Sequence, residues 1–241
     1  MLQFFRKIRQ KLLLQNKFTR YLIYGVGEIV LVVIGILLAL AINGWNEDRK
    51  TIIKEQQILK AISLNLSKNV EVFEQNMSLQ SDYINQIDIL LDHLENGKPY
   101  EDSLGHYFRR LIYLEQVTVN TSAYETLKSL GFELIQSETL RSEIIDLFGY
   151  NYPNSSNLVR DVSLQSYAEK ASEMKKNFRV SLDRAQAVPL DYVALQKDLE
   201  FINYIYQLRG WKLSVIDVNL QLLDPTKALL KNINDYLDQP I

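Results

Sequence analysis

An apolar run near the N-terminus constrains the fold of this chain more than any other feature of its sequence. Residues 22–42 read LIYGVGEIVLVVIGILLALAI, in which Glu28 is the single charged residue. At about 1.5 Å per residue, a helix of this length extends roughly 31 Å, which matches the hydrocarbon core of a bilayer. Tyr21 and Trp45 flank the run, as aromatic residues do at membrane interfaces. The sequence therefore predicts a transmembrane helix at residues 21–45.

Two other interpretations of the run stay open at this point. A cleaved signal peptide would use Ala39-Leu40-Ala41 as its cleavage site. We favour an uncleaved anchor, because the run exceeds the usual signal-peptide core of about 7–15 residues and because Glu28 interrupts it. A buried core helix is less favoured, since the rest of the chain would have to cover it on every side.

The segment before the run, residues 1–20, is strongly basic. It contains six basic residues and no acidic residue, and cationic flanks resist translocation, so we expect the N-terminus to lie inside the cell. Apolar residues at helical spacing also predict an amphipathic helix on an anionic membrane surface. Its membrane-surface residues would be Arg6, Lys7, Arg9 and Lys11. The alternative is that these charges only set the orientation of the chain.

Three residues in the apolar run predict association with another helix. Gly35 and Ala39 are four residues apart, and small residues at this spacing let two membrane helices approach closely. Glu28 lies seven residues before Gly35, on roughly the same side, and a carboxyl group in hydrocarbon gains from a hydrogen-bond donor on a neighbouring helix. A proton or ion site at Glu28 is the alternative interpretation.

The remaining residues, 46–241, form an acidic domain with 21 basic and 28 acidic side chains. This balance argues against nucleic acid as a partner, because phosphate binding needs a basic face. The chain has no cysteine, which excludes disulfides and cysteine-ligated metals. With the N-terminus inside, we expect this domain to lie outside the cytoplasm.

Helical periodicity dominates the acidic domain and predicts an all-α fold, in which the transmembrane helix is followed by an antiparallel bundle of long helices. Residues 49–94 read as one helix, continuous with the span and ended by Gly97-Lys98-Pro99. One heptad position of this helix is apolar except for Gln80 and predicts its core face. The apolar members are Ile52, Leu59, Leu66, Phe73, Ile87 and Leu94.

Shorter helices are expected next. We predict a helix over residues 103–115, a connector at 117–119, and a capping box in which Ser122 and Glu125 start a short helix. Gly131 would end that helix, and Ser137 would cap the next one.

Two long helices complete the predicted bundle. Residues 151–157, NYPNSSN, predict a turn before the first of them. We expect Pro189 to open the last helix and Pro225 to kink or split it. The expected inward residues of the first are Leu158, Val162, Ala168, Ala171, Phe178 and Leu182; those of the last include Leu195, Leu199, Ile202, Ile205, Val215 and Leu222.

Three segments of the chain resemble a family of uncharacterised flavobacterial single-span membrane proteins. They are FFRKIRQKLL, GEIVLVVIGILLALAINGWNE and SAYETLKSLGFELIQSETLRSEI. The sequence departs from the pattern expected of that family at Ala41 and Gly44. The resemblance implies a bacterial inner-membrane protein with a cytoplasmic N-terminus and a periplasmic helical domain, and it implies no activity.

A search for catalytic chemistry finds little. The sequence contains no G-x-S-x-G motif, phosphate loop, dinucleotide fingerprint or Glu-x-x-His pair, so we expect no enzyme activity, no cofactor and no metal. A polar hairpin tip could gather ligands for a metal, although a solvated surface is favoured; its residues are Asp88, Asp92, His93, Glu101, Asp102 and His106. Tyr204, Tyr206 and Trp211 would line a ligand groove or belong to the core or its rim.

Two functions fit these expectations. The favoured one is a non-catalytic scaffold or accessory subunit, tethered to the lipid bilayer, that binds an unknown protein partner or a second copy of itself. The alternative is a periplasmic bundle that senses a ligand. Because the expected cytoplasmic segment has only about 20 residues, such a sensor would signal through a separate protein.

Overall fold

The computed structural model describes residues 18–181 and 185–239, which fall into two compact units. One unit ends at Lys54 and the other is Glu55–Ile241. Helix α2, Phe18–Glu95, contributes residues to both. The long helix predicted to follow the apolar run without a break is therefore confirmed, and Gly97, at φ 62°, lies just beyond its end.

In the N-terminal unit, the apolar part of α2 exposes its side chains. The large apolar side chains from Val30 to Ile42 are each between 47% and 69% exposed. Among the described residues, α2 is the one helix long and apolar enough to cross a membrane, and no side chain in its most apolar window is buried. The interpretation as a buried core helix is therefore wrong, because a core helix is covered by its neighbours.

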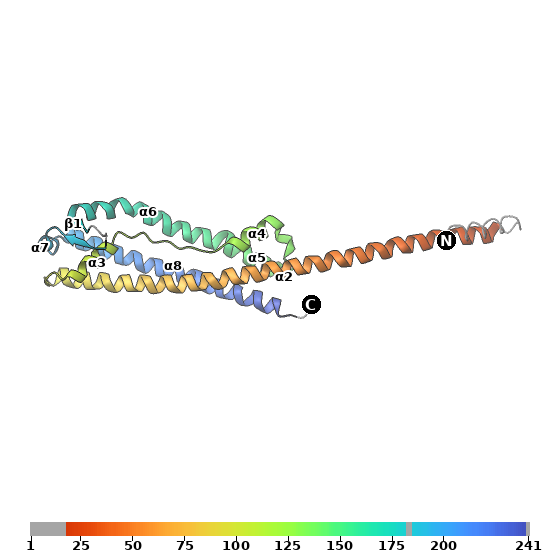
Figure 1. Cartoon of the computed structure of the whole chain (residues 1–241), viewed down its shortest axis with the longest axis horizontal. Coiled ribbons are helices and arrows are strands. Elements are labelled where there is room, and N and C mark those ends of the chain that lie inside the picture. Colours follow the sequence, from red (N-terminus) through yellow and green to blue (C-terminus); the bar gives the residue numbers. More distant parts are fainter. Residues whose placement is uncertain (1–17, 182–184, 240–241) are drawn as a thin grey trace. The chain divides into compact units, whose positions relative to one another are not determined.

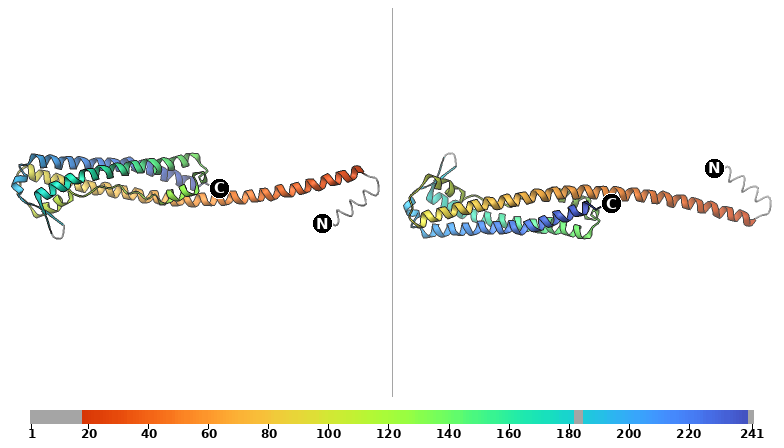
Figure 2. Two further views of the ribbon diagram at one scale, coloured as in Figure 1. Left: turned by 90° about the horizontal axis from the view of Figure 1, so that it is seen from above. Right: turned by 90° about the horizontal axis from the view of Figure 1, so that it is seen from below.

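The second unit is built on three long helices: α2 from residue 55 onward, α6 (Tyr152–Asn177) and α8 (Leu199–Leu237). Figures 1 and 2 show α8, in blue, alongside the yellow part of α2 and the teal α6. Residues with lower numbers in α2 contact residues with higher numbers in α8, so the two helices run antiparallel. They join Glu95 to Tyr206, Asp88 to Arg209, Glu74 to Lys227 and Ser63 to Asn234.

An extended connector at residues 111–121 runs back along α2 between α3 (Asp102–Arg110) and α4 (Ser122–Leu130). Asparagine side chains of α2 hold its backbone. Asn69 donates to the Asn120 carbonyl and accepts from the Asn120 N–H, at 3.2 and 2.7 Å. Asn76 donates to the Gln116 carbonyl at 3.2 Å. The connector predicted at 117–119 is confirmed, and it is longer than expected.

The helix predicted over residues 103–115 is too long by five residues, because α3 ends at Arg110. The extended backbone that follows is hydrogen-bonded by the α2 asparagines, and this competes with continuation of the helix. The predicted capping box is also wrong. Ser122 is the first helical residue, and its hydroxyl bonds Asn65 and Asn120 instead of a backbone N–H of α4.

A short helical turn and helix follow α4. Gly131 ends α4 as predicted, and its φ of 99° favours glycine. The 3₁₀ turn η1 (Phe132–Leu134) leads to α5 (Glu138–Ile145), which Ser137 caps by accepting the Leu140 N–H. A π-helical segment, η2 (Asp146–Asn151), then joins α5 to α6.

The turn predicted at residues 151–157 is wrong, because Pro153 lies in the first turn of α6, where a proline is tolerated. The predicted inward face of α6 is wrong in part. Leu158 is 55% exposed and Ala168 is exposed, whereas Phe178 is buried as predicted, although the helix ends before it at Asn177. Leu182 lies outside the described residues. The residues of α6 that are buried instead are Tyr152, Val159, Ser163, Lys170 and Met174.

A small hairpin separates α6 from α8. Strands β1 (Phe178–Val180) and β2 (Ala187–Pro189) pair antiparallel, and α7 (Tyr192–Leu195) follows. Pro189 therefore ends a strand, and the last helix begins only at Leu199, after the N-cap Asp198. The prediction that Pro225 splits this helix is wrong, since α8 continues through it. Leu199, expected inward, is 78% exposed.

Two apolar clusters form the core of the second unit. The first apolar cluster contains Phe73, Tyr152 and Val215, and the second contains Leu90, Met174 and Ile205. Both draw on α2, α6 and α8, at different heights along the same helices. The heptad face predicted for α2 is confirmed, because Leu59, Leu66, Phe73, Ile87 and Leu94 are all buried.

Candidate functional site

A buried carboxylate on the connector gathers four donors from two helices. Glu115 Oε2 accepts hydrogen bonds from Ser163 Oγ at 3.1 Å, Lys170 Nζ at 3.2 Å and Trp211 Nε1 at 3.2 Å. Glu115 Oε1 accepts a hydrogen bond from Lys212 Nζ. We call these five residues the Glu115 cluster. The donors come from α6 and α8, so the cluster ties the connector to both helices.

The charges of the Glu115 cluster are almost fully withdrawn from solvent. The side chains of Glu115 and Lys170 are each 1% exposed, and that of Lys212 is 4% exposed. Buried charges are expensive unless they are paired and hydrogen-bonded, and here both lysines share one carboxylate. The Lys212 ammonium also lies 4.7 Å from the centre of the Tyr83 ring, within range of a cation–π contact.

Burial and pairing act in opposite directions on the pKa values in the cluster. Burial alone would raise the pKa of Glu115, but attraction to Lys212 and Lys170 outweighs it and holds that pKa below its usual value. For Lys212, burial is the stronger effect and lowers its pKa, despite the nearby Glu115. The carboxylate is therefore charged at neutral pH, and it stabilises the two ammonium groups.

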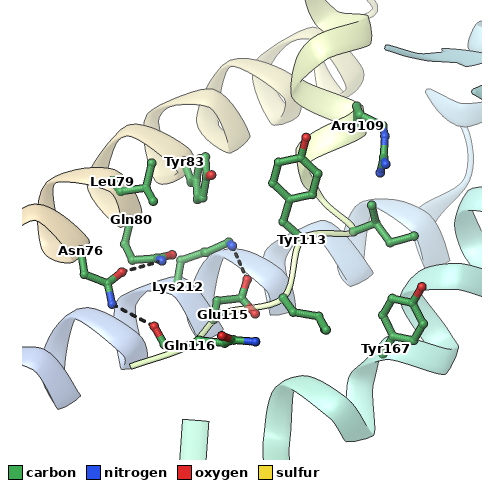
Figure 3. A pocket seen from close by; sticks show the side chains of 12 residues that line it. Asn76, Leu79, Gln80, Tyr83, Arg109, Tyr113, Glu115, Gln116, Tyr167 and Lys212 are labelled. Carbon is green, nitrogen blue, oxygen red and sulfur yellow. Dashed lines mark hydrogen bonds and ion pairs between the residues drawn. The ribbon is translucent and has the colours of Figure 1, made fainter. Parts of the chain in front are cut away.

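An open pocket of about 530 Å³ lies against the Glu115 cluster (Figure 3). Its size is within the range of small-molecule sites, about 300–1,000 Å³. Residues of α2, α3, the connector, α6 and α8 line it: Asn76, Leu79, Gln80, Tyr83, Arg109, Ile112, Tyr113, Leu114, Glu115, Gln116, Tyr167 and Lys212. The lining combines aromatic rings with a few polar groups, as ligand sites do.

One polar atom in this lining lacks a partner. The Gln80 side-chain N–H donates to Asn76 Oδ1 at 3.2 Å, whereas no group among the described residues hydrogen-bonds Gln80 Oε1. Gln80 is only 4% exposed. A buried acceptor without a partner costs about 1–3 kcal/mol, so a donor supplied by a bound molecule would be favourable here.

The residues predicted to mediate helix association lie on α2, in the N-terminal unit. Gly35 and Ala39 are exposed, and a Cβ at Gly35 would meet nothing within 4 Å. Glu28 is half-buried. Arg6, Lys7, Arg9 and Lys11, predicted to lie at the membrane surface, are outside the described residues.

The polar hairpin tip does not gather its carboxylates and histidines into one group. Asp88 pairs with Arg209 of α8, and Asp92 pairs with Lys98. His93 Nδ1 lies 3.2 Å from the Pro99 carbonyl oxygen. Over residues 18–181 and 185–239, no group of three or more His, Asp or Glu side chains is arranged to hold a metal ion.

The aromatic residues singled out on α8 differ in their roles. Tyr204 is buried, and Tyr206 is exposed and donates to Glu95 at 3.0 Å. Trp211 belongs to the Glu115 cluster. Sequence reasoning missed Glu115, Lys170 and Lys212, which carry no motif. Two signals in the sequence point to this region: Trp211, and Gln80, which is the single polar residue on an otherwise apolar heptad position.

Comparison with known proteins gives one match. No curated protein and no solved structure matches this chain. A family model described as "Family of unknown function (DUF6090)" matches residues 28–206, which include most of α2, the connector, α6 and Glu115. The chain therefore belongs to this family of unknown function.

Proposed function

We propose that this chain is a non-catalytic, membrane-anchored protein of the bacterial envelope whose helical bundle binds a small ligand. The pocket beside the Glu115 cluster carries this proposal. It combines a suitable volume, aromatic walls and the unpartnered acceptor of Gln80. Ligand binding, the second of the two functions considered from the sequence, is thus the one that this observation favours.

The anchor is the apolar part of α2. Its exposed apolar side chains need a nonpolar environment, and a bilayer supplies one along the whole length of the run. The basic residues before it favour a cytoplasmic N-terminus, with the bundle in the periplasm. We propose that a separate protein receives the signal when the ligand binds.

Fusions at the C-terminus test the proposed topology. We expect alkaline phosphatase to be active there and a fluorescent protein that folds only in the cytoplasm to be dark. N-terminal sequencing of the mature chain should give Met1 or Leu2. The opposite fusion pattern would overturn the orientation, and a mature chain beginning at Ile42 would show a cleaved signal peptide.

Mass spectrometry of the full chain, purified in mild detergent, tests ligand binding. We expect a small molecule to be released on denaturation from the wild type and from Val72→Trp, and not from Leu79→Trp, which blocks the pocket. Both residues are exposed on α2, seven positions apart, and only Leu79 lines the pocket. No enriched compound, or equal amounts in all three proteins, would overturn the proposal.

A scaffold that pairs with a second copy of itself is the other candidate function. An exposed apolar residue recurs every seven positions along α8, which is the spacing of a helix–helix contact. These residues are Leu199, Tyr206, Leu213 and Leu220. Leu213→Glu should then shift the full chain to a smaller oligomer in light scattering, whereas Ser214→Glu beside it should not. A monomeric wild type would exclude this candidate.

A further inference from the structure

The Glu115 cluster carries more positive than negative charge. Lys170 and Lys212 are both buried, and among the described residues Glu115 is the carboxylate that pairs with both of them. Four donors already occupy the two oxygens of Glu115. A second anion beside Lys212, which lines the pocket, would balance the excess charge.

The pocket also requires a hydrogen-bond donor. Asn76 occupies the N–H side of the Gln80 amide, so Gln80, a residue of the pocket lining, keeps a buried acceptor, Oε1, without a partner. Figure 3 shows Gln80 and Lys212 in the same part of the pocket, reached from α2 and α8. One molecule with an anionic group and an O–H or N–H group would satisfy both features.

Aromatic and aliphatic side chains form the remaining walls. Tyr83, Tyr113 and Tyr167 line the pocket with Leu79 and Ile112. The Tyr83 ring also contacts the ammonium of Lys212. Arg110 also lies over the Tyr83 ring, and Arg109 lies over the Tyr113 ring. The ring surfaces that these cations leave uncovered suit an aromatic ring, which gains from offset or edge-on contacts with tyrosines.

We infer that the pocket binds a small aromatic carboxylic acid that also carries a hydrogen-bond donor. Its carboxylate would lie beside Lys212, its donor would bond Gln80 Oε1, and its ring would pack among the tyrosines. This inference rests on the proposed ligand-binding function and specifies the ligand class. The alternative classes, neutral phenols and aromatic cations, satisfy only part of the site.

Fluorescence of Trp211 provides a direct readout, because its indole N–H bonds Glu115. The chain has two tryptophans, and Trp45→Phe leaves Trp211 alone. In the full chain with this change, in mild detergent, we expect 4-hydroxybenzoate to bind about tenfold more tightly than benzoate, which lacks the donor, or phenol, which lacks the carboxylate. The cation tyramine should bind weakest.

Two substitutions separate the two recognition elements. Lys212→Met leaves Lys170 and Glu115 as a balanced pair and should weaken 4-hydroxybenzoate about tenfold or more, with little effect on phenol. Gln80→Leu should make 4-hydroxybenzoate and benzoate bind equally. Lys227→Met is the matched control, since Lys227 is an exposed lysine of the same helix, paired with Glu74, and it should change no affinity.

The outcomes distinguish the ligand class from ligand binding itself. Equal affinities for benzoate and phenol, preference for tyramine, or equal effects of Lys212→Met and Lys227→Met would overturn the inference. If none of the probes binds but mass spectrometry finds another compound that Leu79→Trp excludes, the class is wrong and the proposed function stands. If neither assay finds a ligand, both fail.

Discussion

Gln80 and the Glu115 cluster form a polar layer between the two apolar clusters. The apolar clusters and this layer draw on the same three helices, α2, α6 and α8, and have opposite chemistry. On α2, one heptad position places Phe73 in the first apolar cluster, Gln80 in the pocket lining and Ile87 in the second apolar cluster. On α8, Val215 and Leu208 flank Lys212 in the same way. The polar layer is therefore a local interruption of a continuous core.

The apolar clusters and the polar layer differ in what they contribute to stability. Burial of apolar side chains stabilises a fold, whereas burial of charges costs free energy that pairing often only offsets. A core continued through positions 80 and 212 with apolar residues would be at least as stable. The proposed ligand binding would account for a polar layer at this position, beside the pocket.

Removing the carboxylate of Glu115 should change the free energy of unfolding more than any other substitution predicted here. Glu115→Ala leaves two buried ammonium groups without a counter-charge, and we expect it to lower the free energy of unfolding by about 5 kcal/mol. Urea unfolding of the full chain in mild detergent, followed by circular dichroism, measures this. A loss below 1 kcal/mol would mean that the lysines escape to solvent.

A triple variant is the control for this prediction. Glu115→Leu combined with Lys170→Met and Lys212→Met removes all three charges together. We expect its free energy of unfolding to equal or exceed that of the wild type, because apolar replacement of buried ion pairs is often neutral or stabilising. A triple variant as unstable as Glu115→Ala would show that the cluster is needed for the fold.

We expect the next largest loss of stability from a substitution in the first apolar cluster. Phe73 is fully buried in the first apolar cluster and contacts the Tyr152 ring edge-on, with centroids 6.0 Å apart. Phe73→Ala should cost about 4 kcal/mol, because it opens a cavity. The neighbouring exposed residue provides the control, and Val72→Ala should cost less than about 0.5 kcal/mol. A cost below 1 kcal/mol for Phe73→Ala would contradict tight packing here.

The smallest predicted effect is the change of the free energy of unfolding with pH. The folded chain holds the pKa of Glu115 below its usual 4.5, so the carboxylate contributes stability above pH 4.5 and loses it as the pH falls through its lowered pKa. Below pH 4.5, the stability difference between the wild type and Glu115→Gln should shrink by up to about 1.4 kcal/mol per pH unit. A difference that stays constant from pH 7 to pH 3 would contradict the assignment.

Much of the fold was predictable because local signals agree with tertiary packing. The heptad pattern of α2 is confirmed from Leu59 to Leu94, and Gly131 and Ser137 mark helix ends as expected. The predictions failed where the surrounding structure outweighs the local preference of the residues. Pro153 and its polar neighbours form the first turns of α6 because a helix accepts proline there and α6 continues directly from η2.

The candidate site was not predictable for a different reason. Lys170 lies between the exposed Glu169 and the half-buried Ala171 of α6, and nothing in its neighbours along the chain indicates that it is buried. The sequence predicts a helix at Glu115, whereas this residue lies on the connector that α2 asparagines hold in an extended path. Residues separated by 55 and 97 positions meet only when α6 and α8 pack around that path.

The sequence by itself determined the apolar run, the basic segment before it, the all-α character and the buried face of α2, because each is a periodic or compositional property of neighbouring residues. The tertiary structure decided which face of α6 is buried and which lysines meet Glu115. It also decided that Gln80, a polar exception in an apolar stripe, lines a pocket. Those features depend on the relative rotation of helices and on long-range pairing, which no local pattern encodes.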